Sequence, residues 1–165
     1  TSWARGVVAA LRRELELEVR GVTAGPLPGL SGVSAARAEV DRVLDSAHRH
    51  PAALGQVTSV DEARATVLLD EIVAQIGAQP RLVDPRVREL LDTDPMLADT
   101  LRAYLDGVGD VAAVAQRLHV HPNTVRYRVR RIEKVLSTSL DDDTDADDRL
   151  VLALSLRAME RNPSP

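Results

Sequence analysis

The chain contains no cysteine and no phenylalanine, and Lys134 is its single lysine among 21 basic residues. The absence of cysteine excludes disulfide scaffolds, cysteine-ligated zinc, iron–sulfur clusters and thiol nucleophiles, and it fits a reducing compartment. The longest stretch without a charged residue, 21–36, is rich in glycine and proline and does not predict a membrane helix. No signal-peptide pattern opens the sequence either. We therefore expect a cytoplasmic protein that does not cross a membrane.

The 165 residues suffice for one sizeable domain or two small ones, and a composition of 44% apolar and 28% charged residues is typical of folded globular proteins. Arginine in place of lysine, together with abundant alanine, valine and leucine, indicates a GC-rich bacterial genome. The sequence begins at Thr1 without an initiator methionine. From this we expect a fragment of a longer protein.

A strong charge asymmetry lies behind the formal net charge of −4. Residues 111–135 contain six basic residues against Glu133 alone, whereas residues 137–148 contain six aspartates and no base. A phosphate backbone responds to the local field of such a basic stripe, so the acidic overall balance does not exclude nucleic acid as a partner. The basic stripe is the feature that a functional hypothesis must explain.

The first half of the sequence predicts a small α+β portion. The expected elements are a helix over 3–17, a strand over 17–22, a helix capped by Ser34 that ends near His50 and Pro51, a short strand over 55–60, and a helix capped by Asp61 that runs to Gly77. Two strands are too few to close a good sheet. We therefore expect that this portion, residues 1–78, is truncated.

The second half, residues 79–165, has the pattern of an all-α domain. Asp84-Pro85 and Asp94-Pro95 each place a capping carboxylate before a proline that suits the first helical position. Gly107 is expected to end the second of these helices. No segment from 81 to 136 has the alternation of a strand, so the fold class that we predict for the chain is mostly α.

Residues 110–136 have the pattern of a helix-turn-helix. Asp110 is expected to cap a short helix over 111–118, in which the small side chain of Ala115 allows a second helix to approach closely. His119-Val120-His121 would form the turn, with His119 at a position of positive φ and Val120 buried as a plug. The second helix would begin at Pro122.

The second helix, 122–136, has two unlike sides. Val125, Val129, Ile132 and Leu136 fall on one face, and the opposite side carries Asn123, Thr124, Tyr127, Arg130, Arg131 and Lys134. A helix that buries an aliphatic stripe and presents amide, hydroxyl and guanidinium groups suits the major groove of DNA. The competing interpretation is an ordinary solvated helix. The short helix, small residue, turn and polar second helix occur together, which favours DNA binding.

These residues resemble a known family. The run from His121 to Ile132, which includes Thr-Val-Arg-Tyr-Arg-Val-Arg-Arg-Ile, is similar to the signature of the C-terminal helix-turn-helix of the PucR and CdaR family of bacterial transcriptional regulators. The resemblance covers about residues 99–157, and Pro122 departs from it because family members often carry a basic residue there. It implies a Fis-like all-α domain that binds DNA as a two-fold dimer.

Residues 1–78 resemble, more loosely, the degenerate GGDEF-like domain that often precedes this helix-turn-helix. The Gly-Gly-Asp/Glu-Glu-Phe motif is absent. The resemblance therefore implies a partial regulatory region that makes no cyclic dinucleotide. It also implies that a small-molecule effector is sensed by a region further upstream.

The sequence thus predicts a transcription regulator that binds duplex DNA sequence-specifically through a recognition helix over 122–136. Base contacts are expected from His121, Asn123, Thr124, Tyr127 and Arg130, and phosphate contacts from Arg126, Arg128, Arg131 and Lys134. The hypothesis would fail if the guanidinium groups were locked into intramolecular pairs, or if the aliphatic face met solvent. The alternative is a protein-interaction or oligomerisation module that keeps the fold without specific DNA binding.

Three other motifs predict no site. The Gly107–Ala112 segment imitates a dinucleotide fingerprint but follows a helix, and the Asp141–Asp145 run lacks the glycine and glutamate of a calcium loop. The His-x-His pairs at His48 and His119 lack tetrahedral ligand spacing. We expect no metal, no cofactor and no enzymatic activity.

The last predicted helix begins after a cap at Asp147 or Asp148 and runs to about Arg161. Its apolar residues cover most of its circumference. Burial on all sides is hard to arrange within a domain of this size, so we expect a homodimer that buries this helix.

Overall fold

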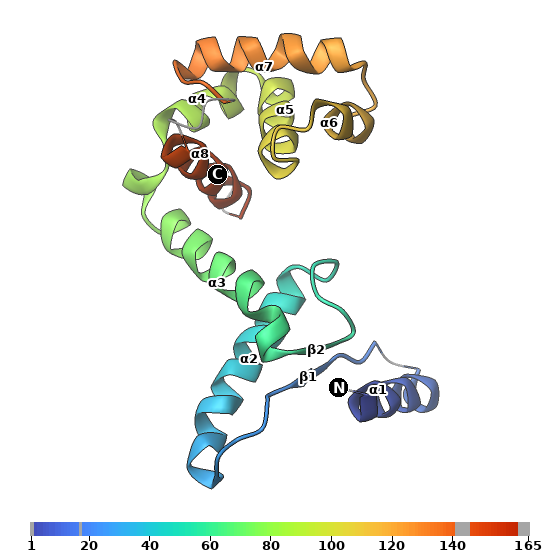
Figure 1. The fold of residues 1–165 in the computed structure, drawn as a ribbon. Coiled ribbons are helices and arrows are strands. Elements are labelled where there is room, and N and C mark those ends of the chain that lie inside the picture. Colours follow the sequence, from blue (N-terminus) through green and yellow to red (C-terminus); the bar gives the residue numbers. More distant parts are fainter. Residues whose placement is uncertain (1, 17, 141–145, 162–165) are drawn as a thin grey trace. The chain divides into compact units, whose positions relative to one another are not determined.

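The computed structural model describes residues 2–16, 18–140 and 146–161, and Figure 1 shows their fold. The chain divides into two compact units, residues 1–72 and 73–165, and the division falls inside helix α3 (Val60–Gly77). Within the described residues there are eight α-helices and two short strands, which confirms a mostly α fold. No helix in these ranges is long and apolar enough to cross a bilayer.

The first unit is built around a pair of parallel strands. It contains α1 (Ser2–Leu15), β1 (Gly21–Thr23), the short 3-10 turn η1 (Leu30–Gly32), α2 (Val33–Arg49), β2 (Val57–Ser59) and the first part of α3. Gly21 pairs with Val57 and Thr23 with Ser59, and α2 is the crossover that parallel strands require. A Cβ on Gly21 would lie 2.8 Å from a Val8 methyl group, so glycine lets α1 approach the sheet.

Two caps predicted in this unit are wrong. Ser34 lies inside α2, because the turn of η1 continues into the helix and the N–H of Val33 already bonds to the carbonyl of Leu30. Asp61 lies inside α3, whose cap is a reciprocal pair: the Ser59 hydroxyl accepts from Glu62 N at 3.2 Å, and the Glu62 carboxylate accepts from Ser59 N at 2.8 Å. These bonds also hold the pKa of Glu62 below its usual range.

The second unit is entirely helical over its described residues. The 3-10 turn η2 (Pro80–Leu82) is followed by α4 (Pro85–Thr93), α5 (Pro95–Asp106), α6 (Val111–Arg117), α7 (Pro122–Leu136) and α8 (Ala146–Arg161). Asp84 accepts from Arg86 N at 2.8 Å and Asp94 from Leu97 N at 3.2 Å, which confirms both predicted Asp-Pro caps. One core joins the five helices; its largest fully buried side chains are Leu90, Leu101, Ile132, Leu136, Leu140, Leu152 and Leu156.

The last helix differs from its prediction at its start. Because α8 begins at Ala146, Asp147 and Asp148 lie in its first turn instead of capping it. The Asp148 carboxylate is bound by Arg86. The calcium-like run Asp141–Asp145 lies outside the described residues. One face of α8 enters the core of its unit, while Leu150 and Val151 are exposed.

Candidate nucleic-acid interface

The turn between α6 and α7 forms as the sequence predicts. Asp110 caps α6, because its carboxylate accepts from Ala112 N at 2.9 Å and Ala113 N at 3.1 Å. His119 has a φ of 54°, which confirms the positive-φ position. Val120 N then donates to the Ala115 carbonyl at 3.0 Å, so the chain turns back over the end of α6. The Val120 side chain is only half-buried against the core.

His121 has a structural role that the sequence did not indicate. It is the N-cap of α7, and its Nδ1 accepts a hydrogen bond from Asn123 N at 3.1 Å, just before Pro122 opens the helix. Because Nδ1 accepts, the proton of the neutral ring is on Nε2. The exposed imidazole therefore presents its Nε2–H donor at the N-terminal end of α7.

Replacing His121 tests this cap. We expect His121→Ala to lower the free energy of unfolding by about 1 kcal/mol, because Asn123 N then has no side-chain acceptor. His121→Ser, whose hydroxyl can cap, is the control and should recover most of the loss. Urea denaturation at neutral pH measures both; equal stability of the two variants would contradict the cap.

The buried face of α7 consists of Val125, Val129, Ile132 and Leu136. These four side chains are between 0% and 5% exposed, so the aliphatic face does not meet solvent. In Figure 1, α7 lies across α4, α5 and α6, and its contacts with these three helices account for the burial. The packing fixes which side of α7 faces outward.

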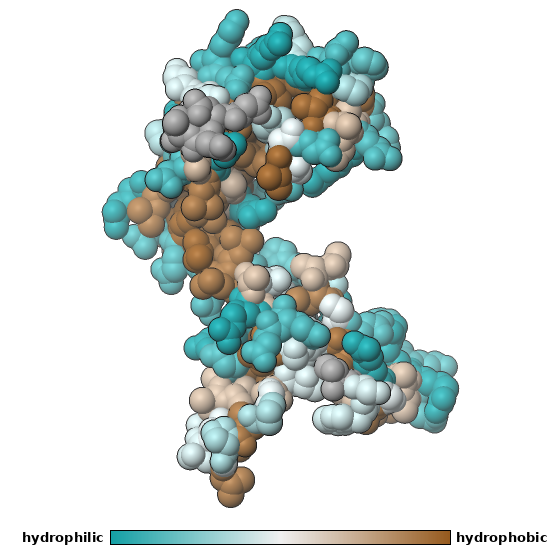
Figure 2. Space-filling view, in the orientation of Figure 1, coloured by the Kyte–Doolittle hydropathy of each residue, from teal (hydrophilic) through white to brown (hydrophobic). Residues whose placement is uncertain are grey.

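The outer face of α7 consists of Asn123, Arg126, Tyr127, Arg130, Arg131 and Lys134, all of them exposed. Figure 2 shows hydrophilic side chains gathered over this helix. Tyr127 is 66% exposed, although it carries an aromatic ring. Thr124 and Arg128 are only half-buried and flank this face. The structure thus brings most of the predicted contact residues onto one surface.

Three of the cations have partners within the chain. Arg131 lies 3.3 Å from Asp94, Arg126 donates to the Asn123 side-chain oxygen at 2.9 Å, and Arg128 donates to the Thr100 hydroxyl at 3.3 Å. The Arg131 side chain remains 56% exposed. An exposed ion pair contributes at most about 1 kcal/mol, so Arg131 can exchange Asp94 for a phosphate. Arg128 is the predicted phosphate contact with the most restricted side chain, since its partner Thr100 is fully buried.

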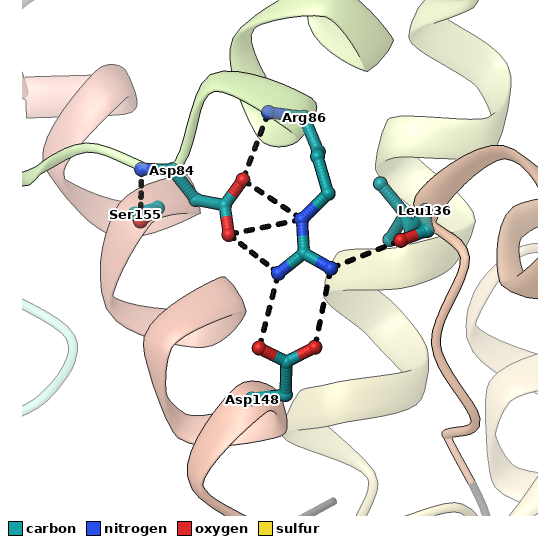
Figure 3. Close-up of polar contacts among 5 residues, drawn as sticks. All are labelled: Asp84, Arg86, Leu136, Asp148 and Ser155. Carbon is teal, nitrogen blue, oxygen red and sulfur yellow. Dashed lines mark hydrogen bonds and ion pairs between the residues drawn. The ribbon is translucent and has the colours of Figure 1, made fainter.

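Arg86 ties the end of α7 to two other helices, as Figure 3 shows. Its Nη1 donates to the Leu136 carbonyl at 2.9 Å and to Asp148 at 3.2 Å, and its Nη2 donates to Asp84 at 2.7 Å and to Asp148 at 3.0 Å. Asp84 starts α4, Leu136 ends α7 and Asp148 lies in the first turn of α8. The bonds from the Arg86 guanidinium to the two carboxylates join ionised groups and are therefore stronger than bonds between neutral groups. No local sequence pattern predicts this cluster, because Arg86 and Asp148 are far apart in the chain.

The Arg86 cluster makes the folding stability of the domain depend on pH in the acid range. Hydrogen bonds from Arg86 hold the pKa values of Asp84 and Asp148 below their usual range, and the two carboxylates raise the pKa of Arg86. Because the folded-state pKa values are depressed, the stabilisation is complete above about pH 4, the unfolded-state value, and is lost as pH falls through the lower folded-state values.

Comparing the melting temperatures of wild type and Arg86→Gln isolates this pH effect. We expect wild type to melt at a higher temperature than Arg86→Gln at pH 7, and the difference in melting temperature to shrink between pH 4 and pH 2. Protonation removes the charge of Asp84 and Asp148, so acid removes the advantage of the guanidinium. Differential scanning calorimetry measures the difference at each pH. A difference that stays constant would contradict the assignment.

Comparisons with known proteins found one family model and several related sequences. Residues 97–158 match the PucR C-terminal helix-turn-helix domain. An uncharacterised protein of Mycobacterium tuberculosis is 42% identical over 80 residues, which are 48% of this chain and 19% of the relative. The purine catabolism regulatory protein of Bacillus subtilis is 39% identical over 66 residues, 40% of this chain and 12% of the relative. An uncharacterised protein of Haemophilus influenzae is 32% identical over 94 residues, 57% of this chain and 24% of the relative. The matched part of the chain thus spans a quarter or less of each relative's length.

Proposed function

We propose, from the PucR-type helix-turn-helix of residues 97–158, that this chain belongs to a bacterial transcription regulator that binds duplex DNA sequence-specifically. The observation that carries the proposal is the two-sided α7, whose aliphatic face is buried while its amide, hydroxyl and cationic groups are exposed. The similarity to a purine catabolism regulatory protein supports the same function. No enzymatic step is part of this proposal.

In the proposed mechanism, α6 supports the interface and α7 enters the major groove as the recognition helix. His121, Asn123, Thr124, Tyr127 and Arg130 would contact base edges near the N-terminal end and along the outer face of α7. Arg126, Arg128, Arg131 and Lys134 would contact phosphates, which hold the protein in register without selecting a sequence. The Nε2–H of His121 suits an acceptor on a base or a phosphate.

Further parts of the proposal concern assembly and regulation. We propose a cytoplasmic homodimer on an inverted repeat; the exposed Leu150 and Val151 on α8 support a dimer contact there. Residues 1–78 would be part of a GGDEF-like regulatory region, followed by the DNA-binding domain over 79–165. A small-molecule effector would be sensed upstream. Sedimentation tests the dimer, and a monomer at micromolar concentration would contradict it.

Selection from a randomised duplex library tests the main proposal. The wild-type chain should enrich a defined sequence, and Asn123→Ala should then cost about 1–3 kcal/mol, mainly through one base pair of that sequence. Enrichment of no sequence would favour the alternative of a protein-interaction module.

Arg131→Ala tests a phosphate contact. We expect weaker binding to all duplexes, and a plot of log affinity against log salt concentration that is less steep by about one unit. The loss should be smaller than that of a cation without a counter-ion, because Arg131 gives up its ion pair with Asp94 when it binds a phosphate. Fluorescence anisotropy between low and high salt measures the slope, and an unchanged slope would place Arg131 outside the interface.

A further inference from the structure

The geometry of the Arg86 cluster is relevant to DNA recognition as well as to folding, because the cluster holds the end of α7. Asp84, Arg86 and Asp148 together carry a net charge of −1, so the cluster repels phosphate and does not form a DNA contact. The Asp84 side chain is 8% exposed and that of Arg86 33% exposed. The guanidinium instead donates to the carbonyl of Leu136, the last residue of α7. Any influence of Arg86 on DNA binding must therefore pass through the placement of α7.

The C-terminal end of α7 needs such a partner. The last four carbonyl oxygens of an α-helix accept no hydrogen bond from an N–H of the same helix. α7 ends at Leu136 because Ser137 adopts a left-handed backbone conformation with a φ of 50°. The apolar packing of the buried face determines which side of α7 faces outward, but it is non-directional. The hydrogen bond from Arg86 to Leu136 is directional and is anchored by carboxylates on two other helices. It therefore restricts the tilt of α7.

A restriction at this end affects the opposite end as well. The 15 residues of α7 span about 22 Å, so a small change of tilt at Leu136 displaces the residues near Pro122. Hydrogen bonds to base edges need atoms placed to within about 0.5 Å, whereas contacts to phosphate tolerate more displacement. The residues near Pro122 include His121 and Asn123, which are proposed to contact bases.

We propose that Arg86 is a positioning residue for sequence recognition, acting through the Leu136 carbonyl to set the tilt of α7. This inference rests on the proposed function. The planar guanidinium of arginine suits this role, because its five N–H donors can bond to Asp84, Asp148 and Leu136 at the same time. A lysine would keep the charge but has a compact head with three donors, and cannot reproduce this arrangement.

The test compares two affinities for each variant of the full chain. One probe is the duplex that wild type enriches from the randomised library, and the other is a scrambled duplex of the same length and composition. The variants are Arg86→Gln and Arg86→Lys. Fluorescence anisotropy is recorded at 10 °C, and circular dichroism verifies that each variant is folded at that temperature. The ratio of the two affinities is the readout, because a loss of folded protein lowers both affinities by the same factor.

Two further variants are matched controls. Ser155→Ala removes the hydroxyl that accepts from Asp84 N at 3.0 Å, so it loosens the same start of α4 without removing the bond to α7. Arg81→Gln removes one positive charge from an exposed residue of the same unit, which donates to the Gln79 side-chain oxygen at 3.0 Å. Both should keep the affinity ratio within about twofold of wild type.

We expect Arg86→Gln to lower the affinity ratio about tenfold and Arg86→Lys to lower it to a similar extent. An unchanged ratio in Arg86→Gln, an equal loss on both probes, or full recovery in Arg86→Lys would overturn the positioning role. If Arg86→Gln does not fold, Asp148→Asn decides, since it weakens the anchor of Arg86 but keeps the arginine; a ratio equal to that of wild type would overturn the role. A wild-type chain that enriches no sequence would instead overturn the proposed function.

Discussion

Ile132→Ala is expected to lower the free energy of unfolding by about 2–5 kcal/mol. Ile132 is 0% exposed and lies in the middle of the buried face of α7, where it joins the shared core of the second unit. Truncation removes its apolar contacts and leaves a cavity in the core that cannot fully close. Because α7 is held to the domain mainly by this face, DNA binding should be lost as the unit unfolds.

Urea denaturation followed by circular dichroism measures this loss. Val135→Ala is the matched control, because Val135 belongs to the same helix but is 48% exposed. Removing exposed methyl groups costs little, so we expect a change within about 0.5 kcal/mol. If the two substitutions had similar effects, α7 would not be anchored by its buried face, and the recognition helix would lose its structural basis.

The second large effect concerns charge. Replacing both Arg130 and Lys134 by glutamate is expected to weaken binding to every duplex about 100-fold at low salt, and to reduce the salt dependence by about two units of slope. Both side chains are exposed on the outer face of α7, so the change should leave the core intact. A carboxylate at the base-facing Arg130 or at the phosphate-facing Lys134 would be repelled by the phosphates that border the groove.

A control with the same change in net charge separates local from global electrostatics. Arg37 and Arg64 lie in the first unit, and their side chains are 80% and 77% exposed. Their double replacement by glutamate alters the charge of the chain equally, yet we expect less than about a threefold change in affinity at moderate salt, because the first unit has no proposed DNA contact and salt screens charges outside the interface. Equal losses in the two double variants would mean that binding follows net charge alone, and the outer face would not be the interface.

Elements with local signals could be predicted from the sequence. Asp84-Pro85 and Asp94-Pro95 start helices as expected, because cap and proline act within one turn of backbone. His119 takes its positive φ for a similarly local reason. The caps at Ser34 and Asp61 were wrong because serine, aspartate and glutamate near a helix start compete, and the preceding turn or strand decides between them. The local sequence offers several solutions there.

Features that depend on distant residues could not be predicted. Arg86 and Asp148 are 62 positions apart, and only the packing of α8 against α4 brings them together. The sequence signal at Asp84-Pro85-Arg86 indicates a cap but not the second carboxylate. Arg128 lies at the edge of the buried face, where the identity of its neighbour Thr100 comes from the crossing of α5 and α7. Which cations face solvent freely is therefore a tertiary property. The assignment of individual residues to bases or phosphates stays a prediction.

Asp94 illustrates what such a tertiary contact would mean under the proposed function, in which the protein finds one DNA site among many. The same carboxylate starts α5 and lies against Arg131, so this cation has a built-in counter-ion before any nucleic acid arrives. A phosphate at that position replaces an existing attraction, and the net gain is smaller than for a bare charge. Under the proposed function, this exchange weakens non-specific binding to DNA and shortens the residence time at each wrong site. Contacts to the correct bases contribute the same binding free energy as before.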